Sequence, residues 1–368
     1  MVGSRRSGGG ANAASCVSKS IVRLRLFTQQ VDQVAPRART TNRLRVATAD
    51  AVAVGNRAVS EVAGSFGVSW GVVHRALVVK AAGLLPEPEP TRVLGIDETR
   101  ARSVRWIRDE DGKWLRTNPW MTSLVNADPA GPGGLLGLSP GRSGASVSDW
   151  LDLQSAQFKA GVEVVVIDPS APYAAAVRRE LPHARIAVDN FHLVALGNQL
   201  VTKVRQRTTR DRHGRRGRLV DPIWNNRRVL LTGADHLSDA QWDRLEATFD
   251  ADDPTGQVQA AWIIKERPRM LLDSGHDESL AAQRLWRFLT ISADSVLPEA
   301  ATLAGTIDTW WPAIRVALAE GVSNGRTEGS NRIIKQTKRV ACGFRSMSNY
   351  RRRIMVHIAV TRQRKTAA

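Results

Sequence analysis

The feature that most constrains the fold is a regular succession of short apolar runs between residues 92 and 200. Short apolar runs bounded by turn residues are typical of strands, and longer runs with a period near 3.6 are typical of helices. The pattern predicts strands at 92–97, 103–107, 119–126, 134–138, 162–167 and 184–188, and helices at 145–158, 171–180 and from about 190. The alternation predicts an α/β domain around a central sheet.

The order of these elements favours a ribonuclease-H-like domain, in which several strands in a row are followed by a helix and then by a strand that ends in an acid. In that topology the first strand lies beside the fourth. Asp97 ends the first apolar run, and Asp168 ends the run at 162–167. We therefore expect these two carboxylates to meet, although they are far apart in the chain.

A third acid, Glu328, stands at the front of a strongly basic stretch. A two-metal site for phosphoryl transfer needs hard oxygen ligands that converge from several elements. Asp97 and Asp168 at strand ends can flank a pair of metal ions, and Glu328 on a following helix can close the site. One strand-end Asp alone would be interpreted as a turn or a helix cap, but three acids in this order favour metal ligation.

Three further residues compete for roles at this site. Glu98 follows Asp97 directly, so on a strand its side chain points to the opposite face. Asp189 also ends a strand-like run, and His192 lies three residues later. Asp189 either caps the helix that follows, or it lines the site together with His192 as a group that positions ligands or substrate. No further His or Cys accompanies them at ligand spacing, so zinc is not expected.

Charge points to a polyanionic partner. The chain has 53 Lys and Arg against 35 Asp and Glu, a formal net charge of +18, which favours nucleic acid or an anionic membrane surface. No apolar run approaches 18 residues and no apolar stretch follows Arg5 and Arg6, so the membrane alternative is disfavoured. Cys16 and Cys342 are the two cysteines, which excludes a disulfide framework and fits a cytoplasmic, nucleoid-associated protein.

Residues 42–84 are predicted to be helical and to contain a helix-turn-helix. Ala63 and Gly67 are four apart, as the tight turn requires, and Val62, Val68 and Val73 fall where the two helices would pack together. An ordinary helical hairpin is the alternative interpretation. In the DNA-binding interpretation, the second helix presents these residues to a major groove: Trp70, Gly71, His74 and Arg75.

Two basic segments follow. Residues 203–228 hold ten Lys or Arg against two acids, which indicates either a solvated face or phosphate contacts, with Arg215 and Arg216 in the central loop. Glu328, Arg332, Lys335 and Arg339 are spaced 4, 3 and 4 and share one helical face, which could hold a DNA strand across the metals. Further candidates for DNA contact are Arg326, Asn331, Lys338 and Arg345. The tryptophans at 242, 262, 286, 310 and 311 are interpreted as core residues.

Several motifs together resemble one family. The chain is similar to bacterial DDE transposases of the ISL-three insertion-sequence family. The motifs that carry the resemblance are Gly95-Ile96-Asp97-Glu98, Asp168-Pro169-Ser170-Ala171-Pro172-Tyr173, Val188-Asp189-Asn190-Phe191-His192, Ser323-Asn324-Gly325-Arg326-Thr327-Glu328-Gly329 and Gly343-Phe344-Arg345.

The resemblance implies a ribonuclease-H-like catalytic domain whose DDE triad is Asp97, Asp168 and Glu328, with two Mg²⁺ or Mn²⁺ ions. It implies hydrolysis at transposon ends, then attack of the freed 3′-hydroxyl on target DNA. It also implies a helix-turn-helix that binds terminal inverted repeats, and a homo-oligomer of at least two chains on double-stranded DNA. A catalytically silent DNA-binding repressor and a structure-specific nuclease are the alternative functions.

One departure from the family pattern concerns the N-terminus. Family members carry a zinc ribbon with several cysteines, whereas this region holds Cys16 alone, and residues 26–28 resemble the end of the ribbon. A truncated or frame-shifted N-terminus is therefore expected. The expected domains are a disordered segment or ribbon remnant at 1–40, the helix-turn-helix at 41–85, the first part of the catalytic core at 86–202, a mainly helical insertion at 203–318, and a final catalytic helix with a basic tail at 319–368.

Overall fold

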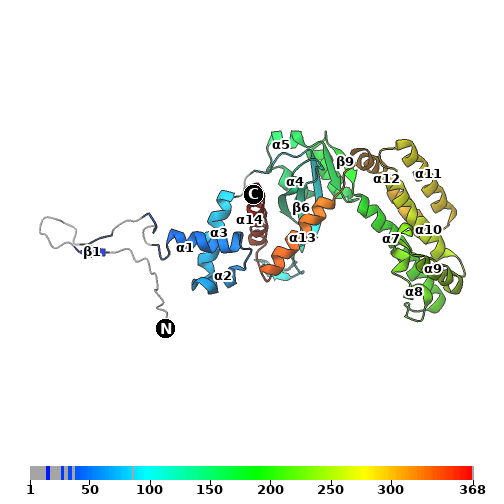
Figure 1. The fold of residues 1–368 in the computed structure, drawn as a ribbon, viewed down its shortest axis with the longest axis horizontal. Coiled ribbons are helices and arrows are strands. Elements are labelled where there is room, and N and C mark those ends of the chain that lie inside the picture. Colours follow the sequence, from blue (N-terminus) through cyan, green and yellow to red (C-terminus); the bar gives the residue numbers. More distant parts are fainter. Residues whose placement is uncertain (1–13, 17–25, 29–31, 35–37, 85–86, 367–368) are drawn as a thin grey trace. The chain divides into compact units, whose positions relative to one another are not determined.

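The computed structural model describes residues 14–16, 26–28, 32–34, 38–84 and 87–366 (Figure 1). The chain divides into two compact units, Pro88–Ser330 and the combination of Met1–Glu87 with Asn331–Ala368. Most of the segment expected to be disordered or a ribbon remnant, 1–40, lies outside the described residues. Within it, the short strand β1 (Ala14–Cys16) pairs with β2 (Leu26–Thr28).

A five-stranded mixed sheet forms the centre of the larger unit. Its order is β7-β6-β3-β8-β9. The central strand β3 is antiparallel to β6 and parallel to β8, and Val93–Ile96 pairs with Val164–Ile167. The expected pairing of the two runs that lead to Asp97 and Asp168 is therefore confirmed. The strands are β3 (Val93–Arg100), β6 (Trp120–Asn126), β7 (Gly134–Pro140), β8 (Val164–Ile167) and β9 (Arg185–Val188).

The prediction that Asp97 ends its strand is wrong, because β3 continues to Arg100. The parallel partner β8 stops at Ile167, but the antiparallel partner β6 pairs with β3 as far as Arg100 opposite Trp120. The ladder with β6 satisfies the backbone groups of these polar residues. Asp97 thus lies inside the strand, one residue beyond the last pair with β8.

The run predicted at 103–107 does not join the central sheet. Strand β4 (Trp106–Arg108) pairs with β5 (Trp114–Arg116) in a separate two-stranded ribbon whose residues are all exposed. The ribbon continues the β3–β6 pair, because the amide of Ala101 donates to the carbonyl of Pro119 and the amide of Thr117 donates to that of Arg105. Trp106, Ile107, Trp114 and Leu115 are residue types that favour strands, but no core covers either face of the ribbon.

Apolar side chains cover both faces of the central sheet. On one face, Leu94 and Ile96 pack in a core with α4 (Gly144–Leu151), α5 (Ala156–Gly161) and α6 (Ala171–Glu180). On the other face, Val93 and Val166 share a core with Ala317 and Val322. Burial on both faces explains the continuous apolar runs. The helix expected at 145–158 is divided in two, because the Ser155 side chain accepts from Phe158 N–H and starts α5.

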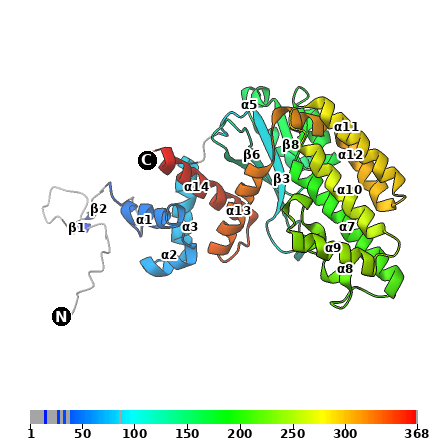
Figure 2. The same ribbon diagram turned by 45° about the vertical axis from the view of Figure 1, so that its right-hand side comes forward.

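Helices with a core of their own make up the rest of the larger unit, and α7, α10, α11 and α12 lie side by side (Figure 2). Trp262 is buried there, with the tryptophans at 242, 310 and 311 packed around the core. Trp286 is 66% exposed, so its interpretation as a core residue is wrong. The helices are α7 (Asn190–His213), α8 (Pro222–Asn225), α9 (Asp239–Asp252), α10 (Gln257–Leu272), α11 (Glu278–Asp294) and α12 (Pro298–Glu320).

The smaller unit contains α1 (Asn42–Ala53), α2 (Val59–Phe66), α3 (Trp70–Leu84) and α14 (Met347–Thr366). Gly67 adopts φ 63° and ends α2, and the α2 and α3 axes meet at 117°. The three valines of the sequence pattern pack in one core, as predicted. Sequence did not predict that α14 joins this core, through Val356 and Val360.

In the described part of the chain, no single helix is long and apolar enough to cross a membrane. Helices α2 and α3 reach the required length and apolar composition only when the bent pair is counted as one segment.

Candidate active site

The strand register brings Asp97 and Asp168 to neighbouring positions. Ile96 and Ile167 are the last paired residues of β3 and β8, and each acid comes next in its chain. Neighbouring strands lie about 4.8 Å apart. Since side chains alternate along β3, Asp97 lies on the face of Val93 and Gly95, opposite the face of Ile96. Both carboxylates are partly buried.

The environment of Asp97 disfavours its negative charge. Burial raises the pKa of the Asp97 carboxyl to about 7, and the nearby charge of Asp168 adds to the rise. The amide of Glu98 donates to Oδ1 of Asp97 at 2.6 Å and offsets part of this effect. A partly buried carboxyl with a raised pKa, such as that of Asp97, is more frequent at functional sites than elsewhere in folded proteins.

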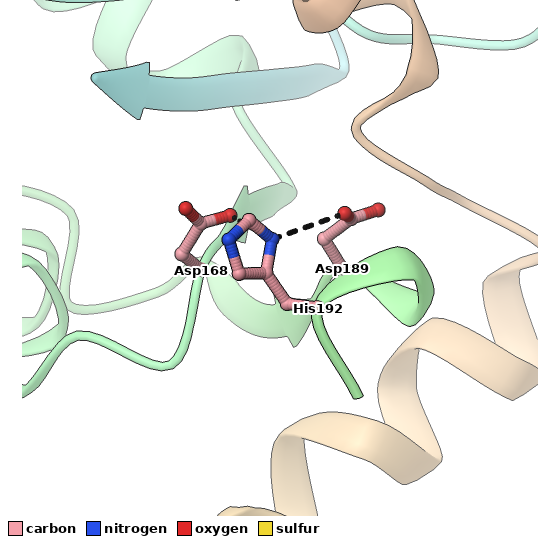
Figure 3. Close-up of side chains that lie close together, drawn as sticks. All are labelled: Asp168, Asp189 and His192. Carbon is pink, nitrogen blue, oxygen red and sulfur yellow. Dashed lines mark hydrogen bonds and ion pairs between the residues drawn. The ribbon is translucent and has the colours of Figure 1, made fainter. Parts of the chain in front are cut away.

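His192 lies between Asp168 and Asp189 (Figure 3). Its Nδ1 is 2.8 Å from Oδ1 of Asp168 and 3.4 Å from Oδ2 of Asp189. The close approach of the Asp168 carboxylate, and then that of Asp189, raise the pKa of the His192 imidazole to about 10. The ligand atoms of these three residues lie within 4.8 Å of one another.

Asp189 does not cap the helix that follows it. It occupies the residue before α7, but its side chain makes no capping hydrogen bond there. The carboxylate is buried, and its Oδ1 accepts from the backbone amide of Asn324 at 2.9 Å. Asp189 therefore joins the end of β9 to the residue that precedes α13 (Gly325–Val340).

Asn324 connects the start of α13 to β3. Its Nδ2 donates to the carbonyl of Ile96 at 3.3 Å, and its Oδ1 accepts from Oγ1 of Thr327 at 2.5 Å. A Cβ on Gly95 would lie 2.6 Å from that Oγ1, so only glycine allows this approach of helix to strand. The first turn of α13, which carries Glu328, is thus held against Gly95 and Ile96 of β3.

The structure does not place all the predicted ligands in one cluster. Of the described residues, neither Asp97 nor Glu328 belongs to the group formed by Asp168, Asp189 and His192. Glu328 lies in the first turn of α13 with an exposed side chain. Asp97 is linked to Asp168 through their electrostatic interaction.

The donor set fits a hard divalent cation. Oδ1 of Asp168 is buried and accepts no hydrogen bond of good geometry, although it faces the His192 ring. Carboxylate oxygens are the ligands that Mg²⁺ prefers. The carboxylates of Asp97, Asp168 and Glu328 could hold such an ion, whereas a protonated His192 has no lone pair to offer on Nδ1.

Glu98 lies on the other face of β3, as alternation along the strand predicts. Its carboxylate is 3.4 Å from the guanidinium of Arg142, which precedes α4. It therefore faces the opposite side from Asp97.

Sequence reasoning missed that Gly95, Asn324 and Thr327 join α13 to β3. All three residues belong to the recognised motifs, but the spacing of those motifs does not predict that the three residues contact one another.

The candidate DNA-binding residues of the smaller unit are mostly accessible. Trp70 is 50% exposed and stacks on His74 with ring centroids 4.5 Å apart. Arg75 and Arg345 are also exposed. Along α13, the side chains at the predicted 4, 3 and 4 spacing are all exposed: Glu328, Arg332, Lys335 and Arg339. Lys338 is partly buried and Asn331 is buried.

Several predicted DNA-binding cations are engaged within the protein instead. Arg326 donates to the carbonyls of Gly131 and Pro129 at 2.8 and 2.9 Å. Arg215 makes a two-point ion pair with Asp221, whereas Arg216 is exposed. In the same basic segment, Arg207 pairs with Glu299 and Arg212 with Asp252. Part of the charge at 203–228 is therefore structural.

The sheet and its carboxylates define an α/β protein with an acidic site suited to cations. The model of a DDE transposase family, ISL3, described as "Transposase", matches residues 94–354. The chain belongs to this ISL-three transposase family, and the resemblance inferred from the motifs is confirmed.

Two curated relatives, both named transposase for insertion sequence element IS1557, come from two strains of Mycobacterium tuberculosis, CDC 1551 / Oshkosh and ATCC 25618 / H37Rv. Each is 27% identical over 264 residues, which cover 67% of this chain and 58% of the relative. The match thus spans little more than half of each relative's length. Among solved structures, the Drosophila P element transposase strand transfer complex aligns at 9% identity and a TM-score of 0.43, over 85% of this chain and 91% of that one.

Proposed function

We propose that this chain is a DDE transposase that cuts DNA at the ends of an insertion sequence and joins the freed ends to target DNA. In this proposal the sheet is a ribonuclease-H-like catalytic core with a helical insertion, and Asp97, Asp168 and Glu328 are its metal ligands. The observation that carries the proposal is the parallel pairing of β3 with β8, which puts two acids from distant parts of the chain side by side. Membership of a transposase family supports the reaction class.

The chain itself contributes position and charge to the reaction. Two bound Mg²⁺ or Mn²⁺ ions would activate the attacking oxygen and stabilise the leaving oxygen. Asp97 and Asp168 bring two carboxylates together on a partly buried surface. Burial and the charge of Asp168 disfavour the ionised form of Asp97, which raises the pKa of its carboxyl to about 7. The contacts of Asn324 with Ile96 and of Thr327 with Gly95 support the proposal that Glu328, in the first turn of α13, completes the site beside Asp97 and Asp168.

Asp189 and His192 act as positioning residues in this proposal. The His192 imidazolium holds the carboxylate of Asp168 from one side, at 2.8 Å. Asp189 uses one oxygen for His192 and the other for the Asn324 amide. A change at Asp189 would therefore disturb both Asp168 and the entry to α13.

The proposal assigns DNA binding to accessible residues of two helices, α3 and α13. Helices α2 and α3 form a helix-turn-helix whose second helix offers Trp70, His74 and Arg75 to a major groove. Arg332 and Lys335 on the exposed face of α13 contact phosphates, which makes binding sensitive to salt. Double-stranded DNA with inverted repeats is the proposed substrate, and transposition chemistry on paired ends calls for at least a dimer.

The test is cleavage of duplex DNA that carries the sequences flanking the gene, with the full chain and Mg²⁺ or Mn²⁺. Asp168→Asn should lower the rate by about a hundredfold or more while duplex binding persists. The matched control is Asp250→Asn, which alters an exposed acid of α9 and should leave the rate unchanged. A wild-type chain that binds this DNA but cuts it in neither metal would instead be a silent repressor.

A further inference from the structure

The β4–β5 ribbon carries two tryptophans and two arginines on one face. In its antiparallel register, Trp106 lies opposite Arg116, and Arg108 lies opposite Trp114. Residues two apart along a strand share a face. These four side chains, here called the Trp–Arg face, therefore alternate aromatic and cationic groups in both directions. The guanidinium carbon of Arg108 is 4.9 Å from the centroid of the Trp114 ring.

The indoles of this face do not contribute to the core of the protein. Trp106 is 59% exposed and Trp114 is 56% exposed. A two-stranded ribbon is marginally stable by itself, and this ribbon gains its support from the backbone bonds that extend the β3–β6 pair. Large aromatic groups gathered in the open indicate a binding surface, because leaving them in water is unfavourable.

The charge around the Trp–Arg face suits a polyanion. Residues 100–116 contain six Lys or Arg and three acids. The acids occupy the tip of the ribbon at 109–111, where Oδ1 of Asp109 accepts from the amide of Lys113 and shapes the turn. The face itself has two cations and no acid. Alternating aromatic and guanidinium groups match alternating bases and phosphates of a nucleic acid strand.

We propose that the Trp–Arg face binds unpaired DNA next to the cleavage site, an inference that rests on the proposed transposase function. Paired bases offer only their edges in the grooves, whereas the flat rings of unpaired bases can stack on an indole. Trp106 and Trp114 would each stack with a base, and Arg108 and Arg116 would contact the phosphates between them. The ribbon thus holds a strand that is separated from its complement.

The position of the ribbon fits this role. It continues from β3, the strand that carries Asp97, and Trp106 lies nine positions after Asp97 in the chain. Nine extended residues span at most about 30 Å. Both elements belong to the larger compact unit. A strand that leaves the cleavage site can therefore reach the ribbon directly.

The experiment measures DNA affinity of the full chain in EDTA, so that no cleavage is needed. The probes are a single strand of about 20 nucleotides, longer than the usual footprint of one binding surface, and a duplex of the same length. The test variant is Trp106→Ala/Trp114→Ala, and the conservative variant is Trp106→Phe/Trp114→Phe. The matched control is Trp286→Ala, which removes an exposed tryptophan of α11.

The double alanine variant should bind the single strand about a hundredfold more weakly, because each base stack contributes about tenfold. Its affinity for the duplex should stay within about twofold of the wild-type value, since α3 and α13, and not the ribbon, provide the proposed duplex contacts. The phenylalanine variant should recover most of the affinity, and Trp286→Ala should match wild type. A 2-aminopurine base in the strand should be quenched by wild type and not by the double alanine variant.

Unchanged single-strand affinity in the double alanine variant would overturn the proposal. Equal losses for single strand and duplex would also overturn it, because they would indicate groove or general phosphate binding. Failure of the ribbon proposal can be distinguished from failure of the proposed transposase function. If Asp168→Asn still cuts DNA, the transposase mechanism fails, whatever the ribbon binds. If Asp168→Asn is inactive but the double alanine variant binds the single strand as wild type does, only the ribbon proposal fails.

Discussion

Removing the Asn324 side chain should destabilise the larger unit more than any neighbouring surface change. Asn324 is 2% exposed. Its side chain donates to the carbonyl of Ile96 and accepts from the hydroxyl of Thr327. Asn324→Ala removes both hydrogen bonds but keeps the backbone amide that donates to Asp189. The variant therefore isolates the contribution of the side chain.

The size of the effect follows from burial of the partners. A buried polar group that loses its partner costs about 1–3 kcal/mol, so two lost bonds should lower the free energy of unfolding by about 2–6 kcal/mol. A urea m-value of about 3 kcal/mol per M is reasonable for a unit of this size. The unfolding midpoint should therefore fall by about 1–2 M.

Tryptophan fluorescence in a urea titration measures this change, because ten of the eleven tryptophans lie in the larger unit. The matched control is Ser323→Ala, which alters the exposed neighbouring residue. We also expect Asn324→Ala to cut DNA more slowly at urea concentrations where it remains folded, since Glu328 loses its support. If Asn324→Ala and Ser323→Ala unfold at the same concentration, Asn324 does not join α13 to β3 as described.

Three further predictions concern stability. In EDTA, the contribution of Asp97 to the free energy of unfolding should fall as pH rises from about 4 to 7, because the pKa of its folded-state carboxyl, about 7, lies above the unfolded value of about 3.9. Asp97→Asn should remove this contribution from a pH series of urea titrations. Gly95→Ala should destabilise by about 1–3 kcal/mol, because its Cβ would lie 2.6 Å from Oγ1 of Thr327, and adding Thr327→Ala should recover part of the loss in the same titration. Glu266→Gln should destabilise by about 3–5 kcal/mol in thermal or urea unfolding, because it removes the carboxylate 2.6 Å from the buried ammonium of Lys265, and an equally stable variant would contradict this.

The sheet was predictable because its strands are buried on both faces and therefore appear in the sequence as continuous apolar runs. The pairing of β3 with β8 followed from the order of the elements, and the helix at 171–180 lies where its sequence pattern indicates. The ribbon at 106–116 was misassigned for the opposite reason. Its residues have strand propensity, but propensity does not reveal whether a core covers them.

The contacts around Asn324 depend on tertiary structure that local patterns do not encode. Asp189 follows a strand and precedes a helix, which is also the pattern of a helix cap, and only the fold shows that its oxygen accepts from Asn324 instead. The packing of α14 on α1 and α3 was likewise hidden, because its basic sequence suggested a tail. Arg353 in α14 is buried and donates to Asn56, a partner nearly 300 residues earlier.

The central claim is that Asp97, Asp168 and Glu328 form the metal site, and Glu328 tests it most directly because its side chain lies outside the cluster around His192. The measurement compares Mg²⁺-dependent cleavage by Glu328→Gln and Asp189→Asn on duplex DNA from the borders of the gene. We predict that Glu328→Gln binds this DNA but does not cut it, whereas Asp189→Asn cuts slowly. Wild-type cleavage by Glu328→Gln together with an inactive Asp189→Asn would contradict the account and assign the metal to Asp168, Asp189 and His192.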